Sequence, residues 1–139
     1  GIPRQPHDLL VHRIGWYSGY PTRERLGFHG TGAPIALELK PALLTNSVHL
    51  LREYAVEHAA IVCLPTLVAS DAVLSGALQL VLPEYALSSF WLSVFYPTAA
   101  RSSLKLKLFL EGLTNSFSGA PPWDSALIER GLIGPNLIE

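Results

Sequence analysis

Cysteine and methionine are the scarcest residue types of this 139-residue chain, which has one cysteine and no methionine. A single cysteine excludes a disulfide within the chain, and a lack of disulfides is typical of cytoplasmic proteins. Cys63 lies in the apolar run 61–64, which indicates a buried core residue rather than a reactive thiol. Because the chain begins at Gly1 and has no methionine, we expect it to be part of a longer translation product.

Charged residues are also few, and neither sign dominates. Asp, Glu, Lys and Arg make up 15% of the chain, and the formal net charge is −1. Proteins that hold the DNA backbone usually carry a clear basic excess or a basic stripe. This chain has neither, so we expect it not to bind nucleic acid directly.

Long apolar runs and targeting segments are missing from the sequence as well. No apolar stretch reaches the roughly 18 residues that a membrane-spanning helix needs, and no signal peptide opens the chain. Hydrophobic residues nonetheless make up 49% of it, enough for a packed core in one domain of this length. The sequence therefore predicts a single folded domain without a membrane span.

Residue patterns for metal binding or catalysis are absent too. The five histidines form no pair at metal-ligand spacing, and a single cysteine argues against a structural zinc site. No Gly-x-Ser-x-Gly motif marks a nucleophile elbow, and Gly30-Thr31-Gly32 lacks the further glycine of a dinucleotide loop. We therefore predict no metal, no cofactor and no enzymatic activity.

Alternating strand and helix patterns fill most of the chain. Residues 25–29 and 35–40, with a glycine-rich turn between them, predict a hairpin. Residues 59–64 are almost continuously apolar, which is typical of a central parallel strand. These patterns predict an α/β fold, a three-layer sandwich with a mixed sheet. The other predicted strands cover 9–17, 78–82 and 90–96, and the predicted helices cover 47–58, 71–75, 103–116 and 124–130.

Short polar residues and glycines mark the expected helix ends. Thr45-Asn46-Ser47 is a capping cluster, because short polar side chains accept hydrogen bonds from the first free amides of a helix. Ser70-Asp71 predicts the start of the helix over 71–75, and Gly76 predicts its left-handed end.

The last long helix carries an apolar stripe that must be buried somewhere. Large unprotected apolar patches are rare on soluble monomers. We therefore expect the chain to self-associate, or to pack this helix on its own sheet. The stripe consists of Leu106, Phe109, Leu110 and Leu113.

The order of several sequence blocks resembles the second half of the effector-binding domain of LysR-type transcriptional regulators. That domain has two α/β halves and is similar to periplasmic binding proteins of type 2. The resemblance covers about residues 1–115, although His58 and Ala60 stand where the family usually has glycine. The blocks are Thr45-Asn46-Ser47, Ile61-Val62-Cys63-Leu64-Pro65, Leu74-Ser75-Gly76-Ala77-Leu78, Val81-Leu82-Pro83 and Val94-Phe95-Tyr96-Pro97.

The resemblance implies an effector-sensing module of a cytoplasmic regulator. Residues 1–97 would be the second effector-binding subdomain, and 98–139 a C-terminal helix and tail that return to the missing first subdomain. The implied partners are a small-molecule effector and a second copy in a dimer, with DNA bound only through a missing N-terminal domain and no membrane contact.

The strongest candidate for an effector site is the capping cluster 45–47. A helix N-terminus presents free amides and a partial positive charge, which suit a carboxylate or phosphate; the alternative is an ordinary cap without a ligand. Residues 65–66 follow a strand at the edge where α/β sheets place ligands, and 17–18 end the first strand. The predicted effector-binding residues are Thr45, Asn46, Ser47, Pro65, Thr66, Tyr17 and Ser18.

Two other classes of function stay open from sequence. A solute-binding protein of similar fold would require a secretion signal, and a small α/β enzyme would require a catalytic constellation. An upstream helix-turn-helix would favour the regulator, whereas an upstream signal peptide would favour the transport protein.

Overall fold

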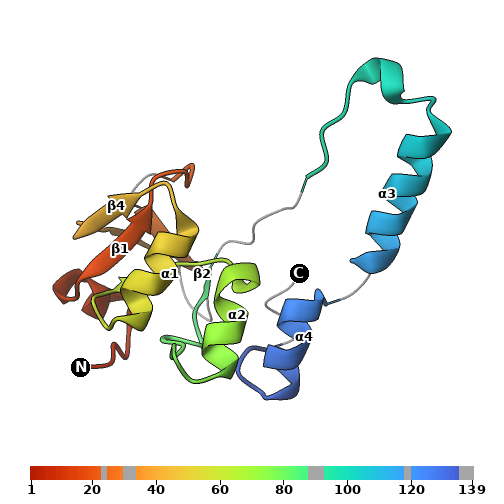
Figure 1. Ribbon diagram of the computed structural model, residues 1–139. Helices are drawn as coiled ribbons and strands as arrows, with labels where there is room; N and C mark the ends of the chain where they lie inside the picture. Colours follow the sequence, from red (N-terminus) through yellow and green to blue (C-terminus); the bar gives the residue numbers. More distant parts are fainter. Residues whose placement is uncertain (23–24, 30–33, 88–92, 118–119, 135–139) are drawn as a thin grey trace.

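A computed structural model describes residues 1–22, 25–29, 34–87, 93–117 and 120–134 of the chain (Figure 1). Its described strands form two three-stranded sheets, one parallel and one antiparallel. The elements are η1 (Pro6–Val11), β1 (Ile14–Tyr17), β2 (Arg25–His29), β3 (Ile35–Glu38), β4 (Leu43–Thr45), α1 (Val48–Val56), β5 (Ile61–Val62), α2 (Thr66–Leu74), β6 (Ala86–Leu87), η2 (Thr98–Ala100), α3 (Leu104–Ser116) and α4 (Pro122–Glu129).

The parallel sheet has the order β4-β1-β5, with β1 in the middle. Gly15 of β1 is level with Leu43 on one side and with Val62 on the other. Helix α1 connects β4 to β5 and packs against all three strands. The carboxyl ends of the three strands therefore lie at one edge, the edge where α1 and α2 begin.

The antiparallel sheet has the order β3-β2-β6 and contains the predicted hairpin. Gly27 of β2 is level with Ala36 of β3. The period-two pattern of 35–40 is confirmed, because Leu37 is buried and Glu38 is exposed. Strand β6 pairs with the other side of β2.

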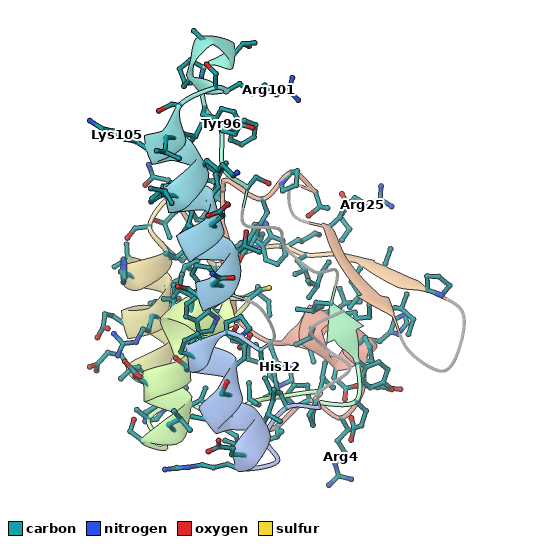
Figure 2. The ribbon with its side chains drawn as sticks, turned by 90° about the vertical axis from the view of Figure 1, so that its right-hand side faces the viewer. Arg4, His12, Arg25, Tyr96, Arg101 and Lys105 are labelled. Carbon is teal, nitrogen blue, oxygen red and sulfur yellow. The ribbon has the colours of Figure 1, made fainter. Side chains whose placement is uncertain are left out.

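The core lies between the two sheets, and α1 covers the opposite face of the parallel sheet. Ile14 and Trp16 of β1 point into a buried cluster that includes Phe28 and Leu37 of the hairpin. Gly15 faces α1 instead, where a Cβ would lie 2.9 Å from Leu51 Cδ2. Figure 2 shows the helices on one side of the molecule and the strands on the other. The layers are thus helix, parallel sheet and antiparallel sheet.

Helices α3 and α4 differ in their contacts with the rest of the molecule. Helix α4 packs on α2, with Leu127 buried, and Arg130 Nη1 donates a hydrogen bond of 2.9 Å to the carbonyl of Leu74 at the end of α2. Helix α3 stands away from both sheets (Figure 1), and none of its residues is buried. The expected alternative in which this helix packs on the chain's own sheet is therefore not what the structure adopts.

The predicted α/β class is confirmed, and both kinds of strand pairing are present. The parallel and antiparallel pairs occupy separate sheets. The helices near 47–58, 103–116 and 124–130 are confirmed as α1, α3 and α4. Gly76 has the expected left-handed backbone, with φ at 80°.

The predicted strand over 9–17 is wrong in its first half, which forms the 3-10 helix η1. The Asp8 carboxylate accepts hydrogen bonds from the backbone amides of Arg4 (2.8 Å) and Gln5 (3.2 Å) and stabilises this turn. Pro6 at the first helical position supplies a fixed φ that suits it.

The segment 59–64 also differs from its prediction. Its paired part is only the two residues of β5, which do pair in parallel, but at an edge of the sheet rather than in its centre. The central place belongs to β1, because both neighbouring strands pair with it.

Three further boundaries are corrections. Helix α2 begins at Thr66, not at Asp71, since the amides of Val68 and Ala69 already bond to the Pro65 carbonyl. Residues 78–82 form no strand, because Leu82 takes a left-handed φ of 56° and turns the chain. Of the strand expected over 90–96, residues 90–92 lie outside the described part, and 93–96 are exposed and unpaired in any sheet.

Within the described ranges, no helix is long and apolar enough to cross a membrane.

Candidate functional site

The carboxyl edge of the parallel sheet collects the residues that the sequence singled out. Tyr17 at the end of β1 is level with Thr45 at the end of β4. The Ser18 amide donates a hydrogen bond of 2.8 Å to the Thr45 carbonyl. The structure therefore places 17–18 directly beside 45–47.

Pro65 and Thr66 lie at the same edge, on the other side of β1. Strand β5 pairs in parallel with β1 through Ile14 with Ile61 and Gly15 with Val62, so both strands end at the same edge of the sheet. Pro65 is the residue before α2, and Thr66 is its first residue. Among the described residues, no hydrogen bond joins these two residues to 45–47, so they belong to the same edge but not to the same hydrogen-bonded cluster.

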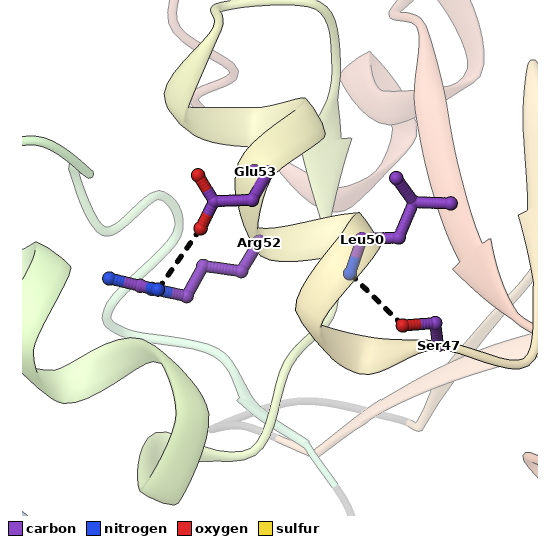
Figure 3. Close-up of polar contacts among 4 residues, drawn as sticks. All are labelled: Ser47, Leu50, Arg52 and Glu53. Carbon is purple, nitrogen blue, oxygen red and sulfur yellow. Dashed lines mark hydrogen bonds and ion pairs between the residues drawn. The ribbon is translucent and has the colours of Figure 1, made fainter.

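Two of the three capping residues are used to build the start of α1. Ser47 Oγ accepts a hydrogen bond of 3.2 Å from the Leu50 amide (Figure 3). Thr45 Oγ1 accepts one of 3.2 Å from the Ser47 amide. The predicted cap is therefore confirmed, with Ser47 as the capping residue.

Asn46 differs from its two neighbours. It is exposed, and among the described residues its side chain makes no hydrogen bond. The first two amides of α1, those of Val48 and His49, precede the amide that Ser47 caps, and such amides have no partner within a helix. The amide donors and the Asn46 carboxamide are therefore available to a ligand.

The charge distribution on α1 leaves this end of the helix free for an anion. No acidic residue occupies the first turn of α1. The Arg52–Glu53 ion pair, at 3.0 Å, lies beyond that turn, and the Arg52 side chain extends toward α2 (Figure 3). A bound anion would meet the positive end of the helix dipole without a competing carboxylate in that turn.

Tyr20 is a residue of this edge that the sequence analysis missed. Its hydroxyl donates a hydrogen bond of 3.0 Å to the Cys63 carbonyl and so links the loop after β1 to the end of β5. Its ring packs edge-on against Trp16 and Tyr17, with both centroid distances at 5.2 Å. Three aromatic residues within five positions at a strand end were the signal that could have found it.

Burial favours the neutral forms of the Tyr20 hydroxyl and of the Cys63 thiol. It raises the pKa of the Tyr20 hydroxyl, so this group stays protonated and acts as a donor. It also raises the pKa of the Cys63 thiol to about 11, which is the behaviour of a core thiol and not of a nucleophile. In the described part of the chain, no three His, Cys, Asp or Glu residues gather as a metal site would require.

The sequence profile of the LysR substrate binding domain family matches residues 1–118 of the chain. The match includes every residue of the carboxyl edge and all of α3, and it ends before α4. A search of curated proteins found no match.

Several solved structures have a similar fold. The regulatory domain of CrgA, a LysR-type transcriptional regulator from Neisseria meningitidis, has a TM-score of 0.64 and 20% identity over 83% of this chain. The regulatory domain of AphB from Vibrio vulnificus has a TM-score of 0.56 and 17% identity over 63% of this chain. The full-length virulence activator AphB of Vibrio cholerae has a TM-score of 0.57 and 16% identity, also over 63%.

The chain spans only part of each of these proteins. It covers 57% of the CrgA domain, 43% of the Vibrio vulnificus AphB domain and 30% of full-length AphB. At these identities the likeness shows the fold, an α/β fold of the regulatory-domain type.

Proposed function

The chain belongs to the family of LysR substrate-binding domains, and from that premise we propose that it is the effector-sensing half of a transcriptional regulator. Its task would be to bind a small molecule at the carboxyl edge of the parallel sheet. The observation that carries this proposal is that 17–18 lie beside 45–47, at the start of a helix whose first turn contains no acidic residue.

The chemistry of the edge supports a small anion, a carboxylate in particular, as the ligand. The amides of Val48 and His49 are donors at the positive end of α1, and Asn46 adds a neutral side chain that can donate or accept. Tyr17 and Ser18 would flank the same ligand, and Pro65 and Thr66 would close it from the side of β5. An edge of this kind is where open α/β sheets bind their ligands.

The proposed output is a population shift. The effector would favour one arrangement of this half relative to the first half and to a second copy, and the DNA-binding domains would follow. DNA contact would come only from a separate N-terminal domain, in keeping with the net charge of −1. The regulator would act as a cytoplasmic dimer, and this domain would have no enzymatic activity and need no cofactor.

We propose different roles for residues 1–97 and for residues 98–139. Residues 1–97 would form the second effector-binding subdomain, and 98–139 would contain the helix that returns to the first subdomain. The exposed α3 supports this assignment because its apolar stripe has nothing to cover it here. Helix α4 contacts α2, so the end of the chain would come back to residues 1–97 after α3 has left.

A charge substitution at Asn46 tests the ligand site without removing the cap. Small aliphatic and aromatic monocarboxylates would be screened by thermal shift against this chain and against a regulatory domain that includes the first half. Hits would then be titrated by amide NMR. We expect Asn46→Asp to weaken binding about tenfold, because like charges repel, while stability stays equal or rises by about 0.3–1 kcal/mol beside the helix start.

Asn115→Asp, near the end of α3, is the matched control in this 139-residue chain, where it should leave binding unchanged. The proposal fails if hits bind both variants equally and shift no resonance of Val48 or His49. A signal peptide encoded upstream, instead of a helix-turn-helix, would replace the regulator with a solute-binding protein.

A further inference from the structure

A small apolar cavity, partly open to solvent, lies between the two sheets and is lined in part by β1, the strand that carries Tyr17. Its volume is about 90 Å³. Side chains from both sheets and from the segment after α2 line it, and none of them carries a charge. The residues that line it include Ile14, Trp16, Phe28, Leu39, Cys63 and Leu82.

One wall of the cavity has an unusual backbone. Leu82 is buried, with 6% of its surface exposed, and it adopts a left-handed φ of 56°. This conformation is costly for a leucine and persists only where the surrounding structure holds it in place. The Tyr85 amide bonds to the Leu82 carbonyl at 3.0 Å and closes the turn.

The same wall also borders a second hollow on the outside of the molecule. Val81 and Leu82 line both spaces, and the hollow is further lined by Arg4, Gln79 and Glu84. The cavity is partly open to solvent, and Val81 and Leu82 form a wall that it shares with the hollow.

The chemistry of the lining decides what can enter. A water molecule needs two to four polar partners, and apolar cavities without them stay dry and take apolar molecules. The Cys63 carbonyl is already bonded to Tyr20. At about 30 Å³ for each water-sized group, the volume corresponds to roughly three or four carbon atoms.

We propose that this intersheet cavity is a second ligand site, which takes a short apolar group of about three or four carbon atoms. The site is separate in space from the proposed anion site at the carboxyl edge, since none of the residues 17–18, 45–49 and 65–66 lines it. Trp16 lines the cavity and also contacts Tyr20, whose hydroxyl holds the end of β5. An occupant would therefore press on the strand and the aromatic pair that shape the carboxyl edge.

Xenon is the first probe, because it is apolar and small enough for this volume. Methyl resonances of the complete 139-residue chain would be followed under increasing xenon pressure. We expect saturable shifts at Ile14, Leu39 and Leu82, with none at the exposed Val11. Shifts that are absent at the cavity, or that rise linearly at exposed and buried methyls alike, would overturn the proposal.

Cys63 gives a second readout, since it is the only cysteine and lines the cavity. Its labelling by methyl methanethiosulfonate would be compared with labelling by the anionic sulfonatoethyl analogue, which has the same reactive group. Relative to free cysteine at the same pH, we expect at least about a tenfold preference for the apolar reagent. Xenon should slow this labelling, and an unchanged rate at saturating xenon would contradict the proposal.

Variants at Val81 connect these readouts to the cavity. Val81→Phe should fill the space and remove the xenon shifts, whereas Val11→Phe makes the same change at a residue that is 86% exposed and should preserve them. If Val81→Phe does not fold, Val81→Ala decides instead, since it enlarges the cavity and should strengthen xenon binding. If neither Val81 variant changes the xenon-induced shifts, xenon binds elsewhere and the proposal is wrong.

Discussion

Helices α1 and α3 are both rich in leucine, but they differ in what covers them. Helix α1 lies on the parallel sheet, and its Leu51 has no exposed surface. Helix α3 carries leucine or phenylalanine at six of its thirteen positions, and none of them is buried. An isolated helix of this length is marginal in water, and most helix stability in proteins comes from packing. The apolar stripe of α3 therefore indicates a partner surface, whereas α1 already has one.

The largest difference that we expect between α1 and α3 is in the unfolding free energy lost when a leucine is truncated to alanine. Leu51→Ala should cost about 2–5 kcal/mol of unfolding free energy, because it leaves a cavity under α1. Leu108→Ala, at a position in α3 that is 59% exposed, should change it by less than about 0.5 kcal/mol. Urea unfolding of both variants measures the difference. Equal losses would show that α3 is packed within the monomer.

Glycine substitution should have opposite signs in the two regions. Gly15→Ala brings a Cβ to 2.9 Å from Leu51 Cδ2 and from Val62 Cγ1, so it should cost about 1–2 kcal/mol. An added Cβ at Gly112 in α3 meets nothing within 4 Å. Gly112→Ala should therefore stabilise α3 by up to about 1 kcal/mol, through helix propensity alone. Thermal unfolding reports the first change and helical circular dichroism the second; a stabilised Gly15→Ala would refute the close packing of α1 on β1.

The helix caps give the smallest expected difference. Ser47 Oγ bonds to the Leu50 amide, so Ser47→Ala should cost about 1 kcal/mol. Ser103 occupies the same position before α3 without a side-chain bond, so Ser103→Ala should change stability by only a few tenths of a kcal/mol. Chemical denaturation of the two variants measures both losses of stability. A larger loss for Ser103→Ala than for Ser47→Ala would contradict the assignment of the two caps.

Local sequence patterns were enough for the elements whose ends are marked by their own residues. Ser47 starts α1, Gly76 follows the end of α2, and the alternation of 35–40 identifies β3. The α/β class follows from such elements, because each has an apolar side that another must cover.

Other boundaries depended on tertiary contacts that a local pattern does not contain. The alternation of 78–82 resembles a strand, but Leu82 reaches the core through a left-handed turn. The apolar 59–64 resembles a central strand, yet β1 holds the centre because strands on both sides pair with it.

The candidate site was predictable in part. The capping cluster and the strand ends 17–18 and 65–66 could be named from sequence, and the structure places them at one edge. Tyr20 was not predicted, because its role depends on a hydrogen bond to the Cys63 carbonyl, 43 positions further along the chain.

We propose that this chain is one half of a two-part sensing domain and that α3 packs on the other half. Hydrogen exchange of the α3 amides tests it most directly, measured in this chain and in a longer protein that includes the first half. We expect fast exchange over Leu104–Ser116 in this chain, and at least about a hundredfold slower exchange when the first half is present. Equal exchange rates for α3 in the two proteins would contradict it.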